Sequence, residues 1–460
     1  MSMIINVKLL VPARIRNVNR TRARINSQKA RENQRLAGAR EGVVQANARQ
    51  TINKKVRCRV SYTIKPFRAT YYNPGKIKNI ASVVCPPYDV ISPAQLERLQ
   101  KTSGYNFSHI LMSHDGEYML QGKKFRDWVS DQVMVDDDQE CFYLYEQTFR
   151  LEKKSYTRYG ILSLLRMDRE GTVFPHEHTL SKPKEDRKKI IRELKANLSP
   201  IFVIIPSKVA SLDSLYKSCL KRKPFFAFKD FGGCRNRLWR VCDPKETRMV
   251  SSVVQKKRLV IADGHHRFEV SYDYFLNNKE KFRDLNYLVA YVSWQQNGLL
   301  ILPTHRVVRL KESLNSVFRK LAQYFEVKTA SAKNIERLLK KDNSPFSFGI
   351  YQNGRYYLLR LKKASTLGKV TSDKFNRKLN TYLLHHFVLP MLDLEQEIEY
   401  THTIVEAKEL SGTEKTAFLL KAIPLDTVFT MANKGYRFPQ KSTYFYPKLL
   451  SGLVVRRFVK

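Results

Sequence analysis

The chain has 460 residues, enough for two or three domains that each bury a core of their own. Its 83 Lys and Arg outnumber 42 Asp and Glu, and the net charge of +41 favours anionic partners. The sequence contains no run of about 18 uncharged apolar residues, so a membrane-spanning helix is not expected.

Residues 1–60 differ from the rest of the chain. They carry 15 Lys and Arg against Glu32 and Glu41, a net charge of 15 − 2 = +13, and few large apolar side chains. Such a segment buries little surface, so we predict a basic, disordered extension. Three interpretations stay open: an arm that binds polyanions, an organellar transit peptide, and a start codon assigned too far upstream.

The rest of the positive charge is spread along the body of the chain without a dominating stripe. It fits either a nucleic-acid-binding protein or an organism whose proteins are basic in general. No helix-turn-helix pattern is present, so only weak, non-specific binding of nucleic acid is expected.

Six cysteines are scattered along the chain without a Cys-x-x-Cys pair: Cys58, Cys85, Cys141, Cys219, Cys234 and Cys242. This scatter favours a reducing, cytoplasmic location in which all of them are small buried thiols. A zinc site of Cys219, Cys234 and Cys242 lacks the short paired spacing of structural zinc.

Residues 61–310 are predicted to form a core domain. Ser92 and Pro93 start a helix, and residues 142–149 and 159–167 alternate like two strands of a hairpin turned at 152–154. A helix is expected at 184–198 and a buried strand at 201–205. The order of elements indicates an α+β fold, with helices packed on a mixed sheet.

Residues 311–460 are predicted to form a second, C-terminal α+β lobe. Helices are expected at 314–325, 334–341 and 378–392. A hairpin at 347–361 turns at Asn353-Gly354, the pair best suited to a type I′ turn.

The strongest candidate site lies at 258–276, where a buried strand leads through Asp263-Gly264-His265-His266-Arg267 into a helix. Amide groups and the positive helix dipole converge at such a turn, so we predict that Gly264 and Arg267 bind phosphate. Asp263 is a candidate proton acceptor or Mg²⁺ ligand, and His265 and His266 are candidate general acid–base groups. The alternative is that Asp263 only caps the helix while the histidines satisfy buried polar groups.

His176-Glu177-His178-Thr179 precedes the basic helix that carries Arg187. We predict that Glu177 is catalytic and that His176 and Arg187 contact a phosphate; the alternative is a polar surface loop.

A further polar cluster, Lys441-Ser442-Thr443, stands beside Tyr444, Phe445 and Tyr446. Hydroxyls and an ammonium next to aromatic rings can bind a nucleotide. An interface between lobes is the other interpretation.

Several stretches occur in a characteristic order: Lys65-Pro66-Phe67-Arg68-Ala69, Pro86-Pro87-Tyr88-Asp89-Val90, Tyr145-Glu146-Gln147, His176-Glu177-His178-Thr179, Asn197-Leu198-Ser199-Pro200-Ile201-Phe202, Ala262-Asp263-Gly264-His265-His266-Arg267, Leu302-Pro303-Thr304-His305-Arg306 and Pro439-Gln440-Lys441-Ser442-Thr443-Tyr444-Phe445. Together they resemble the bacterial domain-of-unknown-function family numbered 1015, over about residues 64–455. That family has no settled activity. Its Asp-Gly-His-His-Arg turn is similar to the phosphate-contacting turn of the ParB and sulfiredoxin superfamily, which includes nucleotide-hydrolysing DNA-partition proteins and a free-serine kinase.

The resemblance implies an enzyme that transfers or hydrolyses a phosphoryl group of a small metabolite, in serine or phosphoserine metabolism. The expected cofactors are Mg²⁺ with ATP, ADP or another nucleotide. The alternatives are a ParB-like, nucleic-acid-associated nucleotide switch and a non-catalytic metabolite sensor. Fold-level analogy alone does not decide among them.

Overall fold

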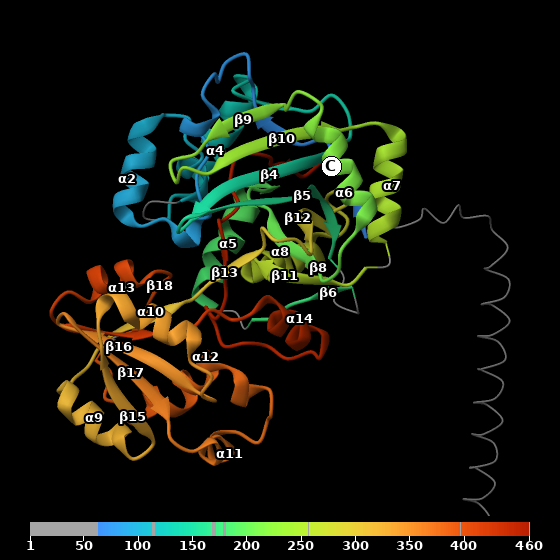
Figure 1. Ribbon diagram of the computed structural model, residues 1–460. Coiled ribbons are helices and arrows are strands. Elements are labelled where there is room, and N and C mark those ends of the chain that lie inside the picture. The colour runs from blue at the N-terminus through green and yellow to red at the C-terminus, as the bar shows by residue number, and fades with distance from the viewer. Residues whose placement is uncertain are drawn as a thin grey trace, which may run out of the picture. The chain divides into compact units, whose positions relative to one another are not determined.

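The computed structural model describes residues 63–112, 116–167, 172–177, 181–255, 257–395 and 397–459 (Figure 1). The expected extension at 1–60, and His178 and Thr179 of the polar motif, lie outside these residues. Residues 62–460 group as a compact unit. Mixed sheets and packed helices confirm the α+β class.

A nine-stranded mixed sheet dominates the first part of this unit. It runs in the order β6-β11-β8-β12-β5-β4-β10-β9, with β1 also paired to β5. The predicted hairpin is confirmed by the antiparallel pairing of β4 and β5, while β8 runs parallel to β12. The strand bounds are β1 Ile64–Lys65, β4 Phe142–Leu151, β5 Lys154–Arg166, β6 Val173–Phe174, β8 Ile201–Ile205, β9 Phe226–Lys229, β10 Arg235–Val241, β11 Leu259–Asp263 and β12 Tyr287–Trp294.

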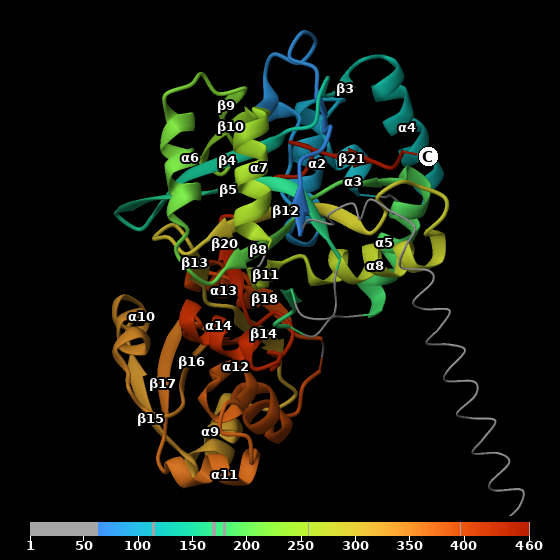
Figure 2. The same cartoon turned by 90° about the vertical axis from the view of Figure 1, so that its right-hand side faces the viewer.

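Both faces of this sheet are covered, which explains its continuous apolar strands. In β8 the alternate residues Ile201 and Val203 join one core with α6 (Ala210–Leu220) and α7 (Pro244–Val254). Figure 2 shows these two helices side by side. Phe202 and Ile204 face a second core. It receives side chains from α2 Pro93–Thr102, α3 Ser108–Leu111, α4 Tyr118–Ser130 and α5 Ser181–Leu194.

Helix boundaries follow both local chemistry and strand pairing. Ser92 caps α2 as predicted, in a capping box with Gln95. Helix α5 ends at Leu194, four residues before the predicted end, because Lys195 adopts a left-handed conformation (φ 49°) and Ala196–Asn197 form strand β7.

A six-stranded antiparallel sheet is built by the second part of the chain, in the order β15-β17-β16-β19-β14-β18. The predicted hairpin β16–β17 is confirmed, with Asn353 and Gly354 at positive φ. The strands are β14 His305–Arg309, β15 Phe325–Ala330, β16 Ser347–Gln352, β17 Arg355–Leu361, β18 Glu399–Thr401 and β19 Lys415–Leu419; the helices are α9 Leu314–Ala322, α10 Ala332–Lys341, α11 Leu367–Val370, α12 Asn380–Leu383, α13 Ile404–Ser411 and α14 Leu425–Asn433.

The continuous helix predicted at 378–392 is wrong. Only Asn380–Leu383 is α-helical, followed by a wider turn at Leu384–Val388 and a tighter one at Leu389–Met391. Pro390 falls in the last turn, where its missing N–H cannot continue an α-helical ladder.

The last residues of the chain leave this second sheet. Strand β20 (Tyr444–Tyr446) pairs with β13 (Leu300–Leu302), and β21 (Arg456–Arg457) pairs with β7. Val455 bonds to Thr70, which begins β2 (Thr70–Tyr72), the partner of β3 (Met134–Asp136). Residues 444–457 therefore pack against elements from the first 302 residues.

One expectation about the cysteines is wrong, because Cys141 and Cys242 form a disulfide. They flank the paired residues Phe142 and Val241 of β4 and β10, which brings their Cα atoms to 4.4 Å. This pairing removes Cys242 from the zinc site considered above, whereas Cys85, Cys219 and Cys234 are buried free thiols. None of the described helices is both long and apolar enough to cross a bilayer.

Candidate functional site

A β-bulge directs Asp263 out of the regular ladder of the large sheet. Ile261 of β11 lies opposite Val203, but Asp263 lies opposite Phe202, so the register shifts between them. Lys448 donates from its ammonium to one carboxylate oxygen of Asp263, and the Arg267 guanidinium donates to the other. Burial would raise the pKa of Asp263, but the two cations outweigh it and hold this pKa well below its usual value. Asp263 is therefore ionised, and Lys448 and Arg267 balance its negative charge. Such a carboxylate is a poor proton acceptor.

The first turn of α8 (His265–Asn278) is an uncapped helix N-terminus. Gly264 occupies the N-cap position in a left-handed conformation, φ 90° and ψ 29°, and no side chain caps the helix. The interpretation that Asp263 is the cap is therefore wrong. The helix also begins three residues earlier than predicted, so His265 and His266 belong to its positive end.

A cavity of about 270 Å³ opens at this helix end. Eight of the eleven predicted site residues line it, namely Glu177, Asp263, Gly264, His265, His266, Arg267, Lys441 and Thr443. Tyr444, the predicted aromatic neighbour of Thr443, lines it as well. Sequence reasoning did not identify its other lining residues as site residues; these are Tyr88, Asp89, Val90, Ala262, Thr304, Tyr400, His402, Gln440 and Lys448.

Glu177 and Thr443, which are 266 residues apart, meet in this cavity. The Thr443 amide and hydroxyl both donate to Glu177 Oε1, at 2.8 and 2.5 Å. His176 Nε2 lies 2.9 Å from the same hydroxyl. Since the Thr443 proton is given to Glu177, the hydroxyl oxygen accepts from His176. Burial lowers the pKa of the wholly buried His176, which favours this neutral arrangement.

His265 lines the cavity in a defined tautomer. Its Nε2 accepts from the His176 backbone N–H at 3.3 Å, so the proton of the neutral ring lies on Nδ1. Burial and the neighbouring His176 lower the pKa of His265 well below its ordinary value. Burial, together with Lys441, also lowers the pKa of His266. Both rings are thus neutral near pH 7.

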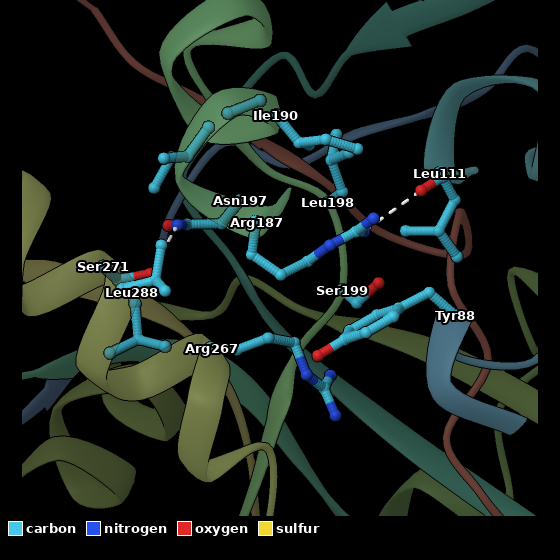
Figure 3. A pocket seen from close by; sticks show the side chains of 13 residues that line it. Tyr88, Leu111, Arg187, Ile190, Asn197, Leu198, Ser199, Arg267, Ser271 and Leu288 are labelled. Carbon is cyan, nitrogen blue, oxygen red and sulfur yellow. Dashed lines mark hydrogen bonds between the residues drawn. The ribbon is translucent and has the colours of Figure 1, made fainter. Parts of the chain in front are cut away.

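Three predicted phosphate contacts do not line this cavity. His176 lies behind Thr443, and the buried Ser442 hydroxyl donates to the Pro439 carbonyl at 2.6 Å. Arg187 lines a separate cavity of about 50 Å³ (Figure 3), where it donates to the Leu111 carbonyl at 3.0 Å and lies 4.1 Å from the Tyr88 ring centre. Tyr88 and Arg267 line both cavities.

Arg267 and Asp263 do not match their predicted roles well. The two terminal nitrogens of Arg267 donate to the Pro200 carbonyl and to Asp263, so a bidentate grip on phosphate requires an exchange of partners. Both oxygens of Asp263 face cations, which does not fit a Mg²⁺ ligand. Across the described ranges, His, Cys, Asp and Glu side chains form no group of three or more that could hold a metal ion.

Lys448 is the most important residue that sequence reasoning missed. It lies 185 positions from Asp263, and only the returning end of the chain brings it there. Two other missed residues, Asp89 and Thr304, stand in the stretches that carry the family resemblance, which was the available signal. Asp89 lies 3.6 Å from the Lys441 ammonium.

Comparison with solved structures finds remote likenesses. A free serine kinase in complex with AMP has 13% identity and a TM-score of 0.31, covering 62% of this chain and 86% of that chain. SbnI from Staphylococcus aureus has 10% identity and a TM-score of 0.35, covering 64% and 86%. A conserved hypothetical protein from Pyrococcus furiosus has 15% identity and a TM-score of 0.32, covering 65% and 95%. TM-scores this low carry no conclusion about function, which has to come from the site itself.

Comparison with curated proteins returns no match. The family described as "Protein of unknown function (DUF1015)" matches residues 64–383, more than half of the chain. These residues include Glu177 and the complete Asp263–Arg267 turn. The chain therefore belongs to the DUF1015 family.

Proposed function

We propose that this protein binds the phosphate of a small phosphorylated metabolite or nucleotide at the N-terminus of α8, and transfers or hydrolyses its phosphoryl group. The proposal rests on one observation: positive groups line the same cavity as a carboxylate without a cationic partner among the described residues. The uncapped end of α8, Lys441 and Lys448 line it together with Glu177, a carboxylate that no Lys or Arg of the described residues neutralises directly.

The positive groups provide the phosphate site. Amides at a helix N-terminus and a nearby ammonium stabilise a dianion by charge and by directed hydrogen bonds. The Lys448 ammonium is held by Asp263 and lies 4.4 Å from the Tyr444 ring centre, so it is fixed before a ligand arrives. Phosphoryl transfer depends mainly on such positioning and charge stabilisation.

Glu177, rather than Asp263, is the better proton acceptor. Asp263 is neutralised by two cations, whereas Glu177 accepts at Oε1 only from Thr443 and has no hydrogen bond at Oε2 to a described residue. In the transfer step an acceptor hydroxyl, of water or of a hydroxy amino acid such as serine, gives its proton to Glu177 Oε2. The new P–O bond forms while the bond to the leaving oxygen breaks. His265 Nδ1–H can donate to a phosphoryl oxygen.

The proposed ligands include ATP and ADP with Mg²⁺. Since Asp263 does not fit as a Mg²⁺ ligand, a metal would be held mainly by the nucleotide's own phosphates. Lys441 and Lys448 offset part of the same negative charge.

The test combines ligand stabilisation with turnover. Orthophosphate, O-phosphoserine, ADP and ATP are added with and without Mg²⁺, and the melting temperature and product formation are measured. We expect stabilisation by at least one phosphate compound. Glu177→Gln should keep this binding but lower turnover by about 10²-fold or more, whereas the exposed control Glu326→Gln should change neither.

Two results would contradict the proposal. If no phosphate compound stabilises the protein, the phosphate site is absent. If a ligand binds but no turnover occurs with any acceptor, the protein is a metabolite sensor and the catalytic part of the proposal is wrong.

A further inference from the structure

A second, wider cavity of about 1020 Å³ adjoins the cavity at α8. The two share six lining residues, which are Asp89, Val90, Tyr400, His402, Tyr444 and Lys448. A phosphate compound bound at α8 can therefore extend its organic part into the wider cavity.

The charge of the wider cavity is opposite to that of the chain. Four carboxylates line it, those of Asp89, Asp230, Glu406 and Glu409, against one lining cation, Lys448; Asp89 also faces the Lys441 ammonium at 3.6 Å. In the whole sequence basic residues outnumber acidic ones by 83 to 42. A local excess of carboxylates in so basic a chain favours a cationic group and disfavours additional phosphates.

Aromatic rings and a buried hydroxyl complete the walls of this cavity. Phe231 is 53% exposed, and Tyr400, Tyr444 and Tyr446 line the same space. Aromatic faces next to carboxylates are a recurring environment for organic ammonium groups. Thr401 also lines the cavity; it is only 7% exposed, and its buried hydroxyl has no hydrogen-bond partner in the described part of the chain.

The geometry points to a zwitterionic ligand that places its phosphate at the N-terminus of α8 and a protonated amine in the wider cavity. This inference rests on the proposed function for its phosphate end. The amine end is carried independently by the carboxylates, the aromatic rings and the Thr401 hydroxyl.

Matched pairs of alkyl phosphates test the amine end. Isothermal titration compares 2-aminoethyl and 3-aminopropyl phosphate with their hydroxyl analogues, and orthophosphate reports the phosphate end alone. The variant is Glu406→Gln with Glu409→Gln. Glu406 accepts the His402 and Thr403 amides at 2.9 and 3.2 Å as part of the cap of α13, and glutamine preserves this capping box.

We expect at least one amine to bind more tightly than its hydroxyl analogue, on the order of fivefold. The preference should weaken in the Glu406/Glu409 double variant, which leaves Asp89 and Asp230 in place, while the affinity for orthophosphate stays the same. The control Glu326→Gln with Glu336→Gln removes the same charge from exposed positions and should keep the preference.

The outcomes separate the two claims. If orthophosphate binds but amines and hydroxyl analogues bind equally, the inference is overturned and the phosphate site stands. Equal loss of preference in the control variant would also overturn it, because general charge would then be the cause. If orthophosphate does not bind, the proposed function fails, and this inference fails with it.

Discussion

The candidate site depends on the ion pair between Lys448 and Asp263. The sequence around either residue does not predict this pair. Asp263 is ionised because it faces two cations, and Lys448 is fixed because it faces that carboxylate and the Tyr444 ring. The Asp263–Lys448 pair lies at the N-terminus of α8, where we propose that phosphate binds.

Replacing Lys448 with methionine tests this pair. The change removes the ammonium but keeps a side chain of similar length, so we expect the affinity for orthophosphate to fall about tenfold or more, as loss of a charge-assisted contact predicts. Isothermal titration measures the affinity. Circular dichroism checks that the variant folds, and the exposed Lys340→Met is the control. Unchanged orthophosphate affinity in Lys448→Met would place the anion elsewhere.

At the residue scale, the sequence predicts a site better than it predicts roles. Polar residues at a strand-to-helix turn mark Asp263–Arg267 because backbone geometry there is local. The partners of these side chains are not local. Lys448 and Thr443 arrive from the far end of the chain, and Pro200 supplies the carbonyl that occupies Arg267. Periodicity and motif spacing contain no information about such contacts.

At the scale of elements, Gly264 determines how β11 passes into α8. A Cβ atom there would lie 2.9 Å from Ile201 Cγ2 and 3.1 Å from the Arg267 guanidinium carbon, at a φ of 90° that strains any other residue. The tight backbone brings the first turn of α8 directly against β8.

Gly264→Ala should therefore both destabilise the fold and weaken phosphate binding. We expect a loss of about 1–3 kcal/mol in the free energy of unfolding, from the left-handed backbone and the contact with Ile201. Gly354→Ala is a matched control, because Gly354 also has a positive φ (77°) but nothing within 4 Å of the added carbon. Urea denaturation and orthophosphate titration measure the two effects. A Gly264→Ala variant as stable as Gly354→Ala would show that the contact is relieved without cost.

Elements with strong local signals were predicted well, and those set by tertiary contacts were not. Alternation identified β4 and β5, and Asn353-Gly354 identified the hairpin of β16 and β17. The end of α5 was missed because β21 captures residues 196–197 as a strand. The broken segment at 380–391 was predicted as one helix because its apolar spacing fits several helical forms.

At the scale of the whole molecule, we expect three buried histidines to contribute to the response of the protein to acid. The wholly buried Arg306 donates to His385 Nε2 at 3.1 Å, and the Leu420 amide donates to His305 Nδ1 at 3.1 Å. Burial, followed by Arg306, lowers the pKa of His385 to about 4 and that of His305 to about 3. Burial and Lys448 lower the pKa of His402 to about 3. The ordinary value is 6.5.

Stability should therefore fall as the pH drops from 6.5 towards 4. Above pH 6.5 these histidines are neutral in both the folded and unfolded states, so their contribution to stability is complete. Below pH 6.5 the unfolded chain takes up protons that the folded protein cannot accept, and each histidine favours unfolding by up to about 1.4 kcal/mol per pH unit. The pKa of Asp263 is lowered as well, so its contribution to stability is also lost as the pH falls, but only below about pH 3.8. The histidines and Asp263 therefore affect stability in different pH ranges.

Urea denaturation between pH 7.5 and 4.5 measures this dependence, and His305→Asn identifies one contributor. The asparagine oxygen can accept the Leu420 amide in place of Nδ1 but does not titrate, so the slope of stability against pH should decrease by about one proton. A stability that is constant from pH 6.5 to 4.5 would mean that the buried rings take up protons without cost. The buried Arg306, which donates to the Thr304 and Lys441 carbonyls and lies over the Tyr400 ring, would then tolerate a protonated His385 beside it without loss of stability.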